Sequence, residues 1–403
     1  MEHRSVRIRA VAFGILAAGL VSVAVAIASS GSGTAVGPRP SASPTVSSLP
    51  LDFRPDQVAC SPIRRYEAMM FGTGPFCVPF DSIPAIDHPR FLPAGSVRFL
   101  GPAAPVIAIE VHGVARAYPV AILAYHEIVN DVVGGVPVAV TFCPLCNSPV
   151  AYGRRLDGHT VRFGVTGQLA ESNLIMFDRR TRTWWQQLSG RAIAGPLTGR
   201  RLRPLAASMV AFGPWRAAHP TASVMRPPAR SPYRYGIDPY GWYDGGPRQP
   251  GVLVRAAPYD HRLPPKWRVI GVPRQGGRGP VAFALPAGRG TFRVARKTAG
   301  SVPLVALFGY GERLPETGRT PPDARLGWSG SVFVASAAGH PVDLLATHHG
   351  FVDRSTRSRF DLLGRAVSGP LAGAQLPAVP QAQAFWFAWS HFSPDTLVVR
   401  PGR

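Results

Sequence analysis

The chain has 403 residues, of which 43 are glycine and 43 are proline, and 44 basic against 22 acidic residues give it a formal charge of +22. Because glycine and proline interrupt helices, this composition excludes a long helical bundle or coiled coil and favours short strands joined by turns. Hydrophobic residues at 46% and charged residues at 16% exclude a wholly disordered chain, because enough apolar surface is present to offset chain entropy. The length predicts two or three domains.

The positive charge is nearly all arginine, because Lys266 and Lys297 are the only lysines. The arginines are spread along the chain, and the densest group, Arg200, Arg201 and Arg203, is short. A nucleic-acid-binding protein usually clusters its basic residues on one helix or arm. We therefore expect no nucleic-acid partner and interpret the charge as a general attraction to anionic cell-envelope surfaces.

The N-terminus has the layout of a signal sequence over residues 1–28. Basic residues precede an uncharged stretch from Ala10 to Ala28 that ends in small residues, as a cleavable signal does. This stretch is also nearly long enough for a spanning helix, so an uncleaved membrane anchor is the alternative. Residues 29–50 are rich in Ser, Pro and Gly and predict a disordered tether. We expect an extracytoplasmic protein, secreted or anchored to the cell membrane by its N-terminal segment.

Export places the four cysteines in an oxidising compartment. Cys60 and Cys77 lie in a proline- and glycine-rich N-terminal segment, residues 51–87. Closing that loop with a disulfide would stabilise the segment by about 3 kcal/mol. We predict a structural disulfide between Cys60 and Cys77, although four cysteines allow three connectivities.

An internal duplication accounts for most of the remaining chain. The sequence GRAIAGPL from Gly190 recurs as GRAVSGPL from Gly364. Further matches pair Trp215 with Trp389, His159 with His340, Asp178 with Asp353 and Arg182 with Arg357. We predict two related tandem units, at residues 88–226 and 252–400. Residues 227–251 between them are rich in Pro, Gly and Tyr and predict a linker whose tyrosine-rich core is a candidate for docking onto one unit.

Within a unit the periodicity is mostly that of strands. The predicted strands of the first unit are VIAIEV (106–111), VPVAVTF (136–142), HTVRFGV (159–165), NLIMF (173–177) and RTWWQQL (182–188). Residues 120–129, and residues 213–219 with a counterpart near Trp389, look helical. The fold class is therefore predicted as mainly β (α+β), with each of the two units a small barrel or sandwich carrying one or two short helices.

Residues that occur in only one copy indicate where a site lies, because shared residues are explained by the fold. Cys143-Pro144-Leu145-Cys146 follows the strand VPVAVTF, and the matching place in the second copy reads Gly309-Tyr310-Gly311-Glu312. His126 and Glu127, in a predicted helix, are also confined to the first copy. We therefore place the chemistry in the first unit and describe the second unit as degenerate.

Two cysteines at this spacing can exchange with a substrate disulfide, bind a soft metal or close a structural disulfide. Our leading hypothesis is that Cys143 and Cys146 cycle between dithiol and disulfide, with His126 or Glu127 as a nearby proton acceptor. The second is copper or zinc binding by Cys143, Cys146 and His126. The third is a non-enzymatic binding module of the cell envelope in which the cysteines form a stable brace. The alternative for His126 itself is an ordinary core histidine.

Several segments together resemble the domain of unknown function 3179 family: PAIDHPRFLPAGSV (84–97), ARAYPVAILAYHEIVND (115–131), GGVPVAVTFCPLCNSPVAY (134–152), DHRLPPKWRVIGV (260–272) and FWFAWSHFSPDT (385–396). The resemblance extends from about residue 80 to residue 400 and includes both units. It implies an exported or membrane-anchored protein. Some members of the family are described as carrying selenocysteine, which resembles a redox use of the cysteine motif. The resemblance implies no substrate. We expect a substrate or partner protein in the cell envelope, which the sequence does not identify.

Overall fold

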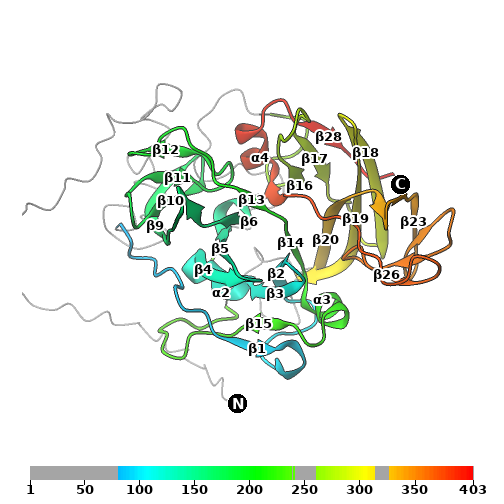
Figure 1. The fold of residues 1–403 in the computed structure, drawn as a ribbon, viewed down its shortest axis with the longest axis horizontal. Helices are drawn as coiled ribbons and strands as arrows, with labels where there is room; N and C mark the ends of the chain where they lie inside the picture. The colour runs from blue at the N-terminus through cyan, green and yellow to red at the C-terminus, as the bar shows by residue number, and fades with distance from the viewer. Residues whose placement is uncertain (1–79, 238, 241–259, 314–325, 403) are drawn as a thin grey trace, which may run out of the picture. The chain divides into compact units, whose positions relative to one another are not determined.

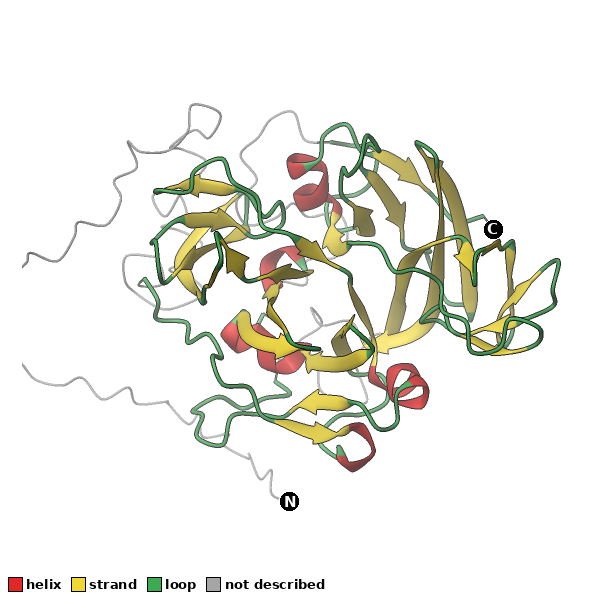
Figure 2. Cartoon of the chain, viewed as in Figure 1, coloured by secondary structure: helices red, strands yellow, loops and turns green. Residues whose placement is uncertain are grey.

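The computed structural model describes residues 80–237, 239–240, 260–313 and 326–402. In this part of the chain strands make up 48% and helices 9% (Figure 2), so the predicted mainly β fold is confirmed. The predicted signal sequence, tether and Cys60–Cys77 disulfide lie outside the described residues. Among the helices that are described, none has the length and apolar character needed to span a membrane.

The first half contains a five-stranded sheet in the order β1-β15-β3-β2-β14 (Figure 1). Its strands are β1 (Phe91–Pro93), β2 (Pro105–Val111), β3 (Val114–Pro119), β14 (Ala207–Ala211) and β15 (Ser223–Met225). β2 and β3 form a tight hairpin because His112 and Gly113 both take positive φ, as a two-residue turn requires. β15 runs parallel to β3, and the other neighbouring strands are antiparallel.

A second sheet, in the order β13-β6-β5-β4, carries the cysteine motif. Its strands are β4 (Ile128–Val133), β5 (Val136–Cys143), β6 (Ser148–Gly153) and β13 (Pro204–Leu205). Side chains alternate across a strand, and both faces of β5 are buried. Val140 and Phe142 pack in one hydrophobic cluster, whereas Ala139 and Cys143 pack in another. Cys143 therefore points into the core on the opposite side of the strand from Phe142.

The helix predicted over residues 120–129 is shorter in the structure, where α2 spans Val120–His126. Glu127 takes a left-handed conformation with φ 57 and ends the helix. The chain then continues as β4, whose first residues are β-branched and pack well in a sheet. Residues 128 and 129, which were predicted to be helical, therefore pair with β5 as part of a strand.

A third sheet in the first half has the order β12-β11-β10-β9. Its strands are β9 (Phe163–Ala170), β10 (Asn173–Asp178), β11 (Trp184–Gln186) and β12 (Ala192–Ala194), preceded by a small hairpin of β7 (Arg155–Leu156) and β8 (His159–Thr160). The segment 159–165, predicted as one strand, is thus divided between β8 and β9. The helix α3 (Phe212–Ala218) follows β14.

The second half repeats this succession of elements. It contains β16 (Arg268–Val272), β17 (Val281–Ala284), β18 (Phe292–Ala299), β19 (Val302–Arg313), β20 (Leu326–Val334), β21 (Ser336–Ala337), β22 (His340–Pro341), β23 (Leu344–Thr347), β24 (Gly350–Asp353), β25 (Arg359–Phe360), β26 (Ala366–Ser368), β27 (Ala382–Phe385), α4 (Trp386–Phe392) and β28 (Leu397–Val399). The order β27-β16-β17-β28 corresponds to β14-β2-β3-β15, and the last pair is parallel in both. Likewise, β23 to β26 correspond to β9 to β12.

Several shared residues hold turns. The carboxylate of Asp178 accepts hydrogen bonds from the backbone and hydroxyl of Thr181, and Asp353 does the same with Thr356. Arg182 and Arg357 take positive φ, at 64 and 61. These matched residues serve the fold, which supports the search for a site among the unmatched ones.

The two halves pack against each other in a hydrophobic cluster that surrounds the cysteines. Cys143 and Cys146 from the first half lie in the same cluster as Trp386 and Trp389 of α4 from the second half. The predicted linker also contacts the first half, since Tyr233 stacks on Tyr125 of α2 with ring centroids 4.8 Å apart. The surroundings of the cysteines are thus built from segments far apart in the sequence.

Candidate functional site at the cysteine pair

The cysteine motif forms the connection between β5 and β6. Cys143 is the last residue of β5, and Pro144 to Cys146 form a 3-10 helix, η4. Asn147 is left-handed with φ 48, which reverses the chain so that Ser148 at the start of β6 pairs with Cys143. The two cysteines lie 3.9 Å apart and form no disulfide. The turn itself therefore brings the predicted pair together.

Both thiols are buried and share one hydrogen-bond acceptor. Cys143 is 2% and Cys146 0% exposed. Each Sγ donates to the carbonyl oxygen of Ser172, at 3.5 Å from Cys143 and 3.2 Å from Cys146. Burial raises the pKa of the Cys146 thiol well above its ordinary value, and the neighbouring Cys143 raises it further. Reaction of Cys146 as a thiolate therefore needs a proton acceptor.

Ser172 belongs to the turn between β9 and β10. Ala170 pairs with Asn173, so Glu171 and Ser172 are the two turn residues, with φ 47 and 65. Such a turn normally contains Gly, Asn or Asp, and left-handed backbone at other residues costs about 1 to 3 kcal/mol each. Strained backbone of this kind concentrates at functional sites. Here it directs the Ser172 carbonyl at both thiols.

Glu171 is electrostatically connected to both Cys146 and His391. Its side chain is 3% exposed, and after burial and the contacts with Cys143 its charge also raises the pKa of Cys146. Burial lowers the pKa of His391, and the charge of Glu171 opposes that effect. His391 is on α4, whose Phe392 packs on the cluster that contains Ala170. The Glu171 carboxylate is therefore within electrostatic range of Cys146, and the His391 imidazole is within electrostatic range of that carboxylate.

A buried hydrogen-bond network fixes the strands that flank the motif. Asn173 Nδ2 donates to Ser148 Oγ at 3.2 Å and to Gln187 Oε1 at 3.0 Å. Gln187 Nε2 donates to Thr141 Oγ1 at 2.8 Å. Buried networks with satisfied members restrict local motion. This one ties β5, β6 and β10 together around the two sulfur atoms.

Asn147 is the polar residue next to the motif that the network does not include. It is 1% exposed, and within the described part of the chain neither its Oδ1 nor its Nδ2 has a hydrogen-bond partner. A buried unsatisfied polar group costs about 1 to 3 kcal/mol. Such a group in a native protein calls for a role that offsets this cost, and here it directly follows Cys146.

The hydrogen bonds of His126 and Glu127 do not involve the cysteines for which they were predicted as proton acceptors. His126 donates from Nδ1 to the Pro84 carbonyl and accepts at Nε2 from the Tyr235 hydroxyl, both at 2.6 Å. Both ring nitrogens are thus used, and neither hydrogen bond involves a cysteine. Burial raises the pKa of Glu127 to about 8, although its hydrogen bond with Tyr240 lowers it.

A metal site formed by three ligands is not assembled in the described residues. No group of three or more His, Cys, Asp or Glu side chains there is placed to hold a metal ion. The two cysteines are close together, but His126 is not grouped with them in this way. The set of Cys143, Cys146 and His126 considered for copper or zinc is therefore not present as a unit.

Four residues near the motif were not predicted from the sequence: Glu171, Ser172, Asn147 and His391. The duplication held a signal for three of them. The turn of Glu171 and Ser172 corresponds to His348 and His349 in the second half, and the match of Trp215 with Trp389 places Ala217 opposite His391. Comparing the turns and helices of the two copies residue by residue would have identified them as unshared.

Within the described residues, the fold and the site define a duplicated β protein with a buried pair of cysteines, Cys143 and Cys146. The chain belongs to the family described as "Protein of unknown function (DUF3179)", whose model matches residues 80–396. This match confirms the family resemblance predicted from the sequence. No curated protein and no solved structure matches the chain.

Proposed function

We propose that Cys143 and Cys146 are a reversible dithiol/disulfide couple in an extracytoplasmic protein. The observation that carries the proposal is their separation of 3.9 Å without a bond. A disulfide requires about 2.05 Å between sulfurs, so a small displacement within η4 closes it. The signal-like N-terminus supports the location, and a disulfide of a cell-envelope molecule is the substrate class that fits it.

The exchange proceeds in two steps. The thiolate of one cysteine attacks a sulfur of the substrate disulfide and forms a mixed disulfide, and one substrate thiolate leaves and takes up a proton. The second cysteine then attacks the first, which forms the Cys143–Cys146 disulfide and releases the second substrate thiol. Two electrons and two protons pass from the protein to the substrate. Because burial raises the pKa of Cys146, a base must accept its proton, and Glu171 with His391 supplies one.

Features beyond the cysteine pair favour a redox couple over a structural brace. A brace needs neither a strained Glu171-Ser172 turn nor an unsatisfied amide at Asn147. Both features cost stability, and a role in chemistry explains why they are present. Since the thiols are buried, exchange also requires a local opening of the site.

The test is reaction of the reduced full-length protein with oxidised glutathione, followed by acid quenching and mass spectrometry of the peptide that contains both cysteines. The proposal predicts an internal disulfide that dithiothreitol reduces again without denaturant. In Cys143→Ser and Cys146→Ser, the remaining cysteine should stop at the mixed disulfide with glutathione. A pair that stays reduced with excess oxidant, or that is reduced only after unfolding, contradicts the proposal.

A further inference from the structure

The tyrosine-rich segment that follows β15 lies against the end of α2. We name residues 231–237 together with Tyr240 the tyrosine strap. From residue 231 to residue 236, half-buried and exposed positions alternate. The half-buried ones are Ser231, Tyr233 and Tyr235. The strap thus turns one row of side chains toward the protein and the other toward solvent.

Two residues at the end of α2 hold the strap through aromatic contacts and hydrogen bonds. The ring of Tyr125 stacks on Tyr233 with centroids 4.8 Å apart, and its hydroxyl donates to the Ile237 carbonyl at 2.8 Å. The next residue, His126, accepts at Nε2 from the Tyr235 hydroxyl at 2.6 Å. These two neighbouring side chains therefore attach three positions of the strap to α2.

His126 is fixed in orientation from its other side. Its Nδ1 donates to the Pro84 carbonyl at 2.6 Å, because a carbonyl oxygen only accepts. Burial lowers the pKa of His126, so the ring is neutral at pH 7 and its Nε2 accepts from Tyr235. The Tyr235 hydroxyl in turn accepts from Ser231 Oγ at 2.7 Å. A continuous chain of hydrogen bonds therefore runs from Pro84 through His126 into the strap.

The far end of the strap meets the hydrophobic cluster that contains the cysteines. Tyr240 packs against the cluster that includes Cys143 and Cys146 and forms a hydrogen bond with Glu127. The Glu127 carbonyl accepts the backbone N–H of Phe142 at 2.8 Å, and Phe142 directly precedes Cys143. The strap therefore extends from α2 to the cluster in which both thiols are buried.

The strap is attached more weakly than the strands around it. Within the part of the chain that the structure describes, no backbone–backbone hydrogen bond joins residues 231–237 to another segment. The Ile237 N–H donates inside the strap, to the Arg234 carbonyl, and the hydrogen bond from Tyr125 is exposed. Segments held by few, solvent-exposed hydrogen bonds open at a lower free energy than the whole protein. The strap can therefore leave α2 while the sheets stay folded.

The residues that hold the strap occur in the repeat that carries the cysteines. In the second repeat, Ala287 and Gly288 stand opposite His126 and Glu127, and residues 309–312 replace the cysteine motif. Residues that the fold itself requires recur in both repeats. The joint occurrence of the strap anchors and the cysteines therefore indicates a role connected with the cysteine site.

We propose that the tyrosine strap is a lid on the cysteine site, and that its release from α2 admits the substrate disulfide to Cys143 and Cys146. The inference rests on the proposed redox function, because exchange at buried thiols requires a local opening and the strap supplies it. Lids of this kind exclude water from a site until a substrate arrives.

The test measures alkylation of Cys143 and Cys146 by iodoacetamide in the reduced full-length protein without denaturant, read by mass spectrometry. Tyr125→Phe and Tyr235→Phe each remove a hydrogen bond of the strap but keep the ring. Each should speed alkylation about fivefold, because one net hydrogen bond less holds the lid closed. The double variant should react faster than either single variant.

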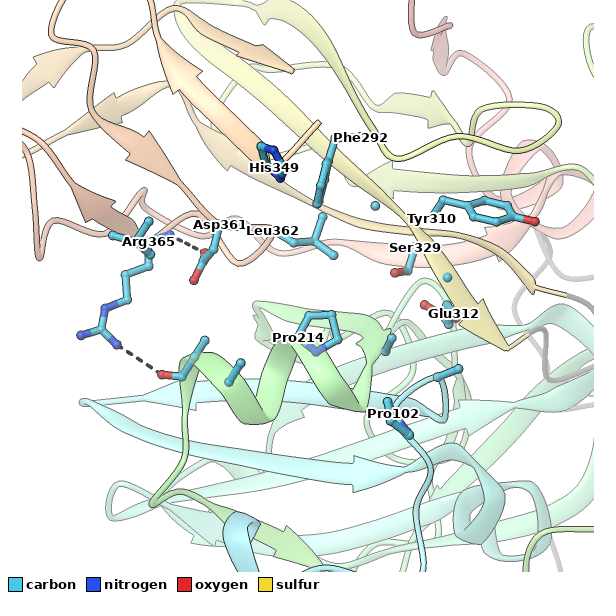
Figure 3. A pocket seen from close by; sticks show the side chains of 18 of the residues that line it. Pro102, Pro214, Phe292, Tyr310, Glu312, Ser329, His349, Asp361, Leu362 and Arg365 are labelled. Carbon is cyan, nitrogen blue, oxygen red and sulfur yellow. Dashed lines mark hydrogen bonds between the residues drawn. The ribbon is translucent and has the colours of Figure 1, made fainter. Parts of the chain in front are cut away.

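Tyr310→Phe is the matched control in the second half. Tyr310 also donates from its hydroxyl to a backbone carbonyl, that of Leu326 at 3.2 Å. Its surroundings are a cavity of about 730 Å³ beside α3 (Figure 3), and the strap does not line that cavity. Loss of this hydroxyl should leave the alkylation rate of the cysteines unchanged.

Urea distinguishes release of the lid from unfolding of the whole protein. Release of the strap exposes little surface, so the alkylation rate should rise only slightly with urea, whereas global unfolding depends on urea steeply. Equal rates in Tyr125→Phe, Tyr235→Phe and Tyr310→Phe, or rates that follow the urea dependence of global unfolding, overturn the lid. Alkylation needs no disulfide exchange. Variants that are alkylated faster in a protein that forms no disulfide with oxidised glutathione would therefore support the lid and contradict the redox couple.

Discussion

At the scale of single residues, substitution of Asn147 is expected to affect stability and disulfide exchange in opposite directions. It takes a left-handed conformation, and in the described chain its buried amide is unsatisfied. Glycine accepts this backbone and removes the amide, so Asn147→Gly should raise the free energy of unfolding by about 1 kcal/mol. The same change should slow disulfide exchange. Urea unfolding and the exchange rate with oxidised glutathione measure the two effects.

Asp157→Gly is the matched control, since Asp157 is also left-handed, with φ 47, but lies in an exposed turn away from the motif. It should leave the exchange rate unchanged. If Asn147→Gly destabilises the protein, or leaves exchange as fast as in the natural chain, the unsatisfied amide of Asn147 does not trade stability for disulfide exchange.

Glu171 is predicted to be the proton acceptor of the couple. Glu171→Gln removes the base but keeps the size of the side chain, and general base catalysis contributes about 100-fold or more. We expect the exchange rate to fall by about 100-fold and its pH dependence to become steeper, because hydroxide must then remove the proton. Stopped-flow measurements of the exchange rate between about pH 6 and pH 9 test both expectations.

His391→Gln should also lower the exchange rate, because His391 interacts electrostatically with Glu171. Glu110→Gln, at an exposed position of β2, is the control for loss of one negative charge. Equal rates in Glu171→Gln and Glu110→Gln would remove Glu171 from the mechanism.

The raised pKa of Glu127 predicts how the free energy of unfolding depends on pH. Its pKa in the folded protein is raised from 4.5 to about 8, so the folded state binds a proton more tightly than the unfolded state. Its contribution is fully present below pH 4.5 and is lost as the pH rises through about 8. In the natural chain this titration should lower the free energy of unfolding by at most about 5 kcal/mol across the window. Glu127→Gln should remove that pH dependence. Urea unfolding across the window measures it, and an unchanged pH profile contradicts the assignment.

At the scale of elements, α4 is predicted to cover the cysteine site. Trp389 of α4 belongs to the cluster that contains both cysteines, whereas its counterpart Trp215 of α3 belongs to a cluster without them. Trp389→Ala and Trp215→Ala should each destabilise the protein by about 3 to 5 kcal/mol. At concentrations of urea that leave both variants folded, iodoacetamide should modify Cys143 and Cys146 faster in Trp389→Ala only. Equal rates in the two variants would show that α4 does not protect the site.

The elements also show what the sequence could predict. The apolar run VPVAVTF gave β5 within one residue, and NLIMF gave β10 within one residue. The predicted helix ended early at Glu127 because pairing of β4 with β5 depends on contacts distant in the sequence. Likewise, RTWWQQL is a strand only over Trp184–Gln186, because Asp178 holds a turn with Thr181 and Arg182.

At the scale of the whole molecule, duplication explains both what was predicted and what was missed. The C-x-x-C spacing located Cys143 and Cys146, because both cysteines lie in one turn. Glu171 and His391 belong to another hairpin and to the second half of the chain, and no local pattern connects them with the cysteines. The second repeat thus contributes α4 to the hydrophobic cluster that contains the cysteines of the first repeat.

The reduction potential of the Cys143–Cys146 pair tests the central claim most directly. The full-length protein is equilibrated in buffers of reduced and oxidised dithiothreitol or glutathione, and the redox state is read from the peptide that holds both cysteines. A reversible couple predicts a potential between about −120 and −270 mV, the range of exchange catalysts, whereas structural disulfides lie below about −300 mV. A potential below that limit would identify the pair as a structural brace and contradict the proposed function.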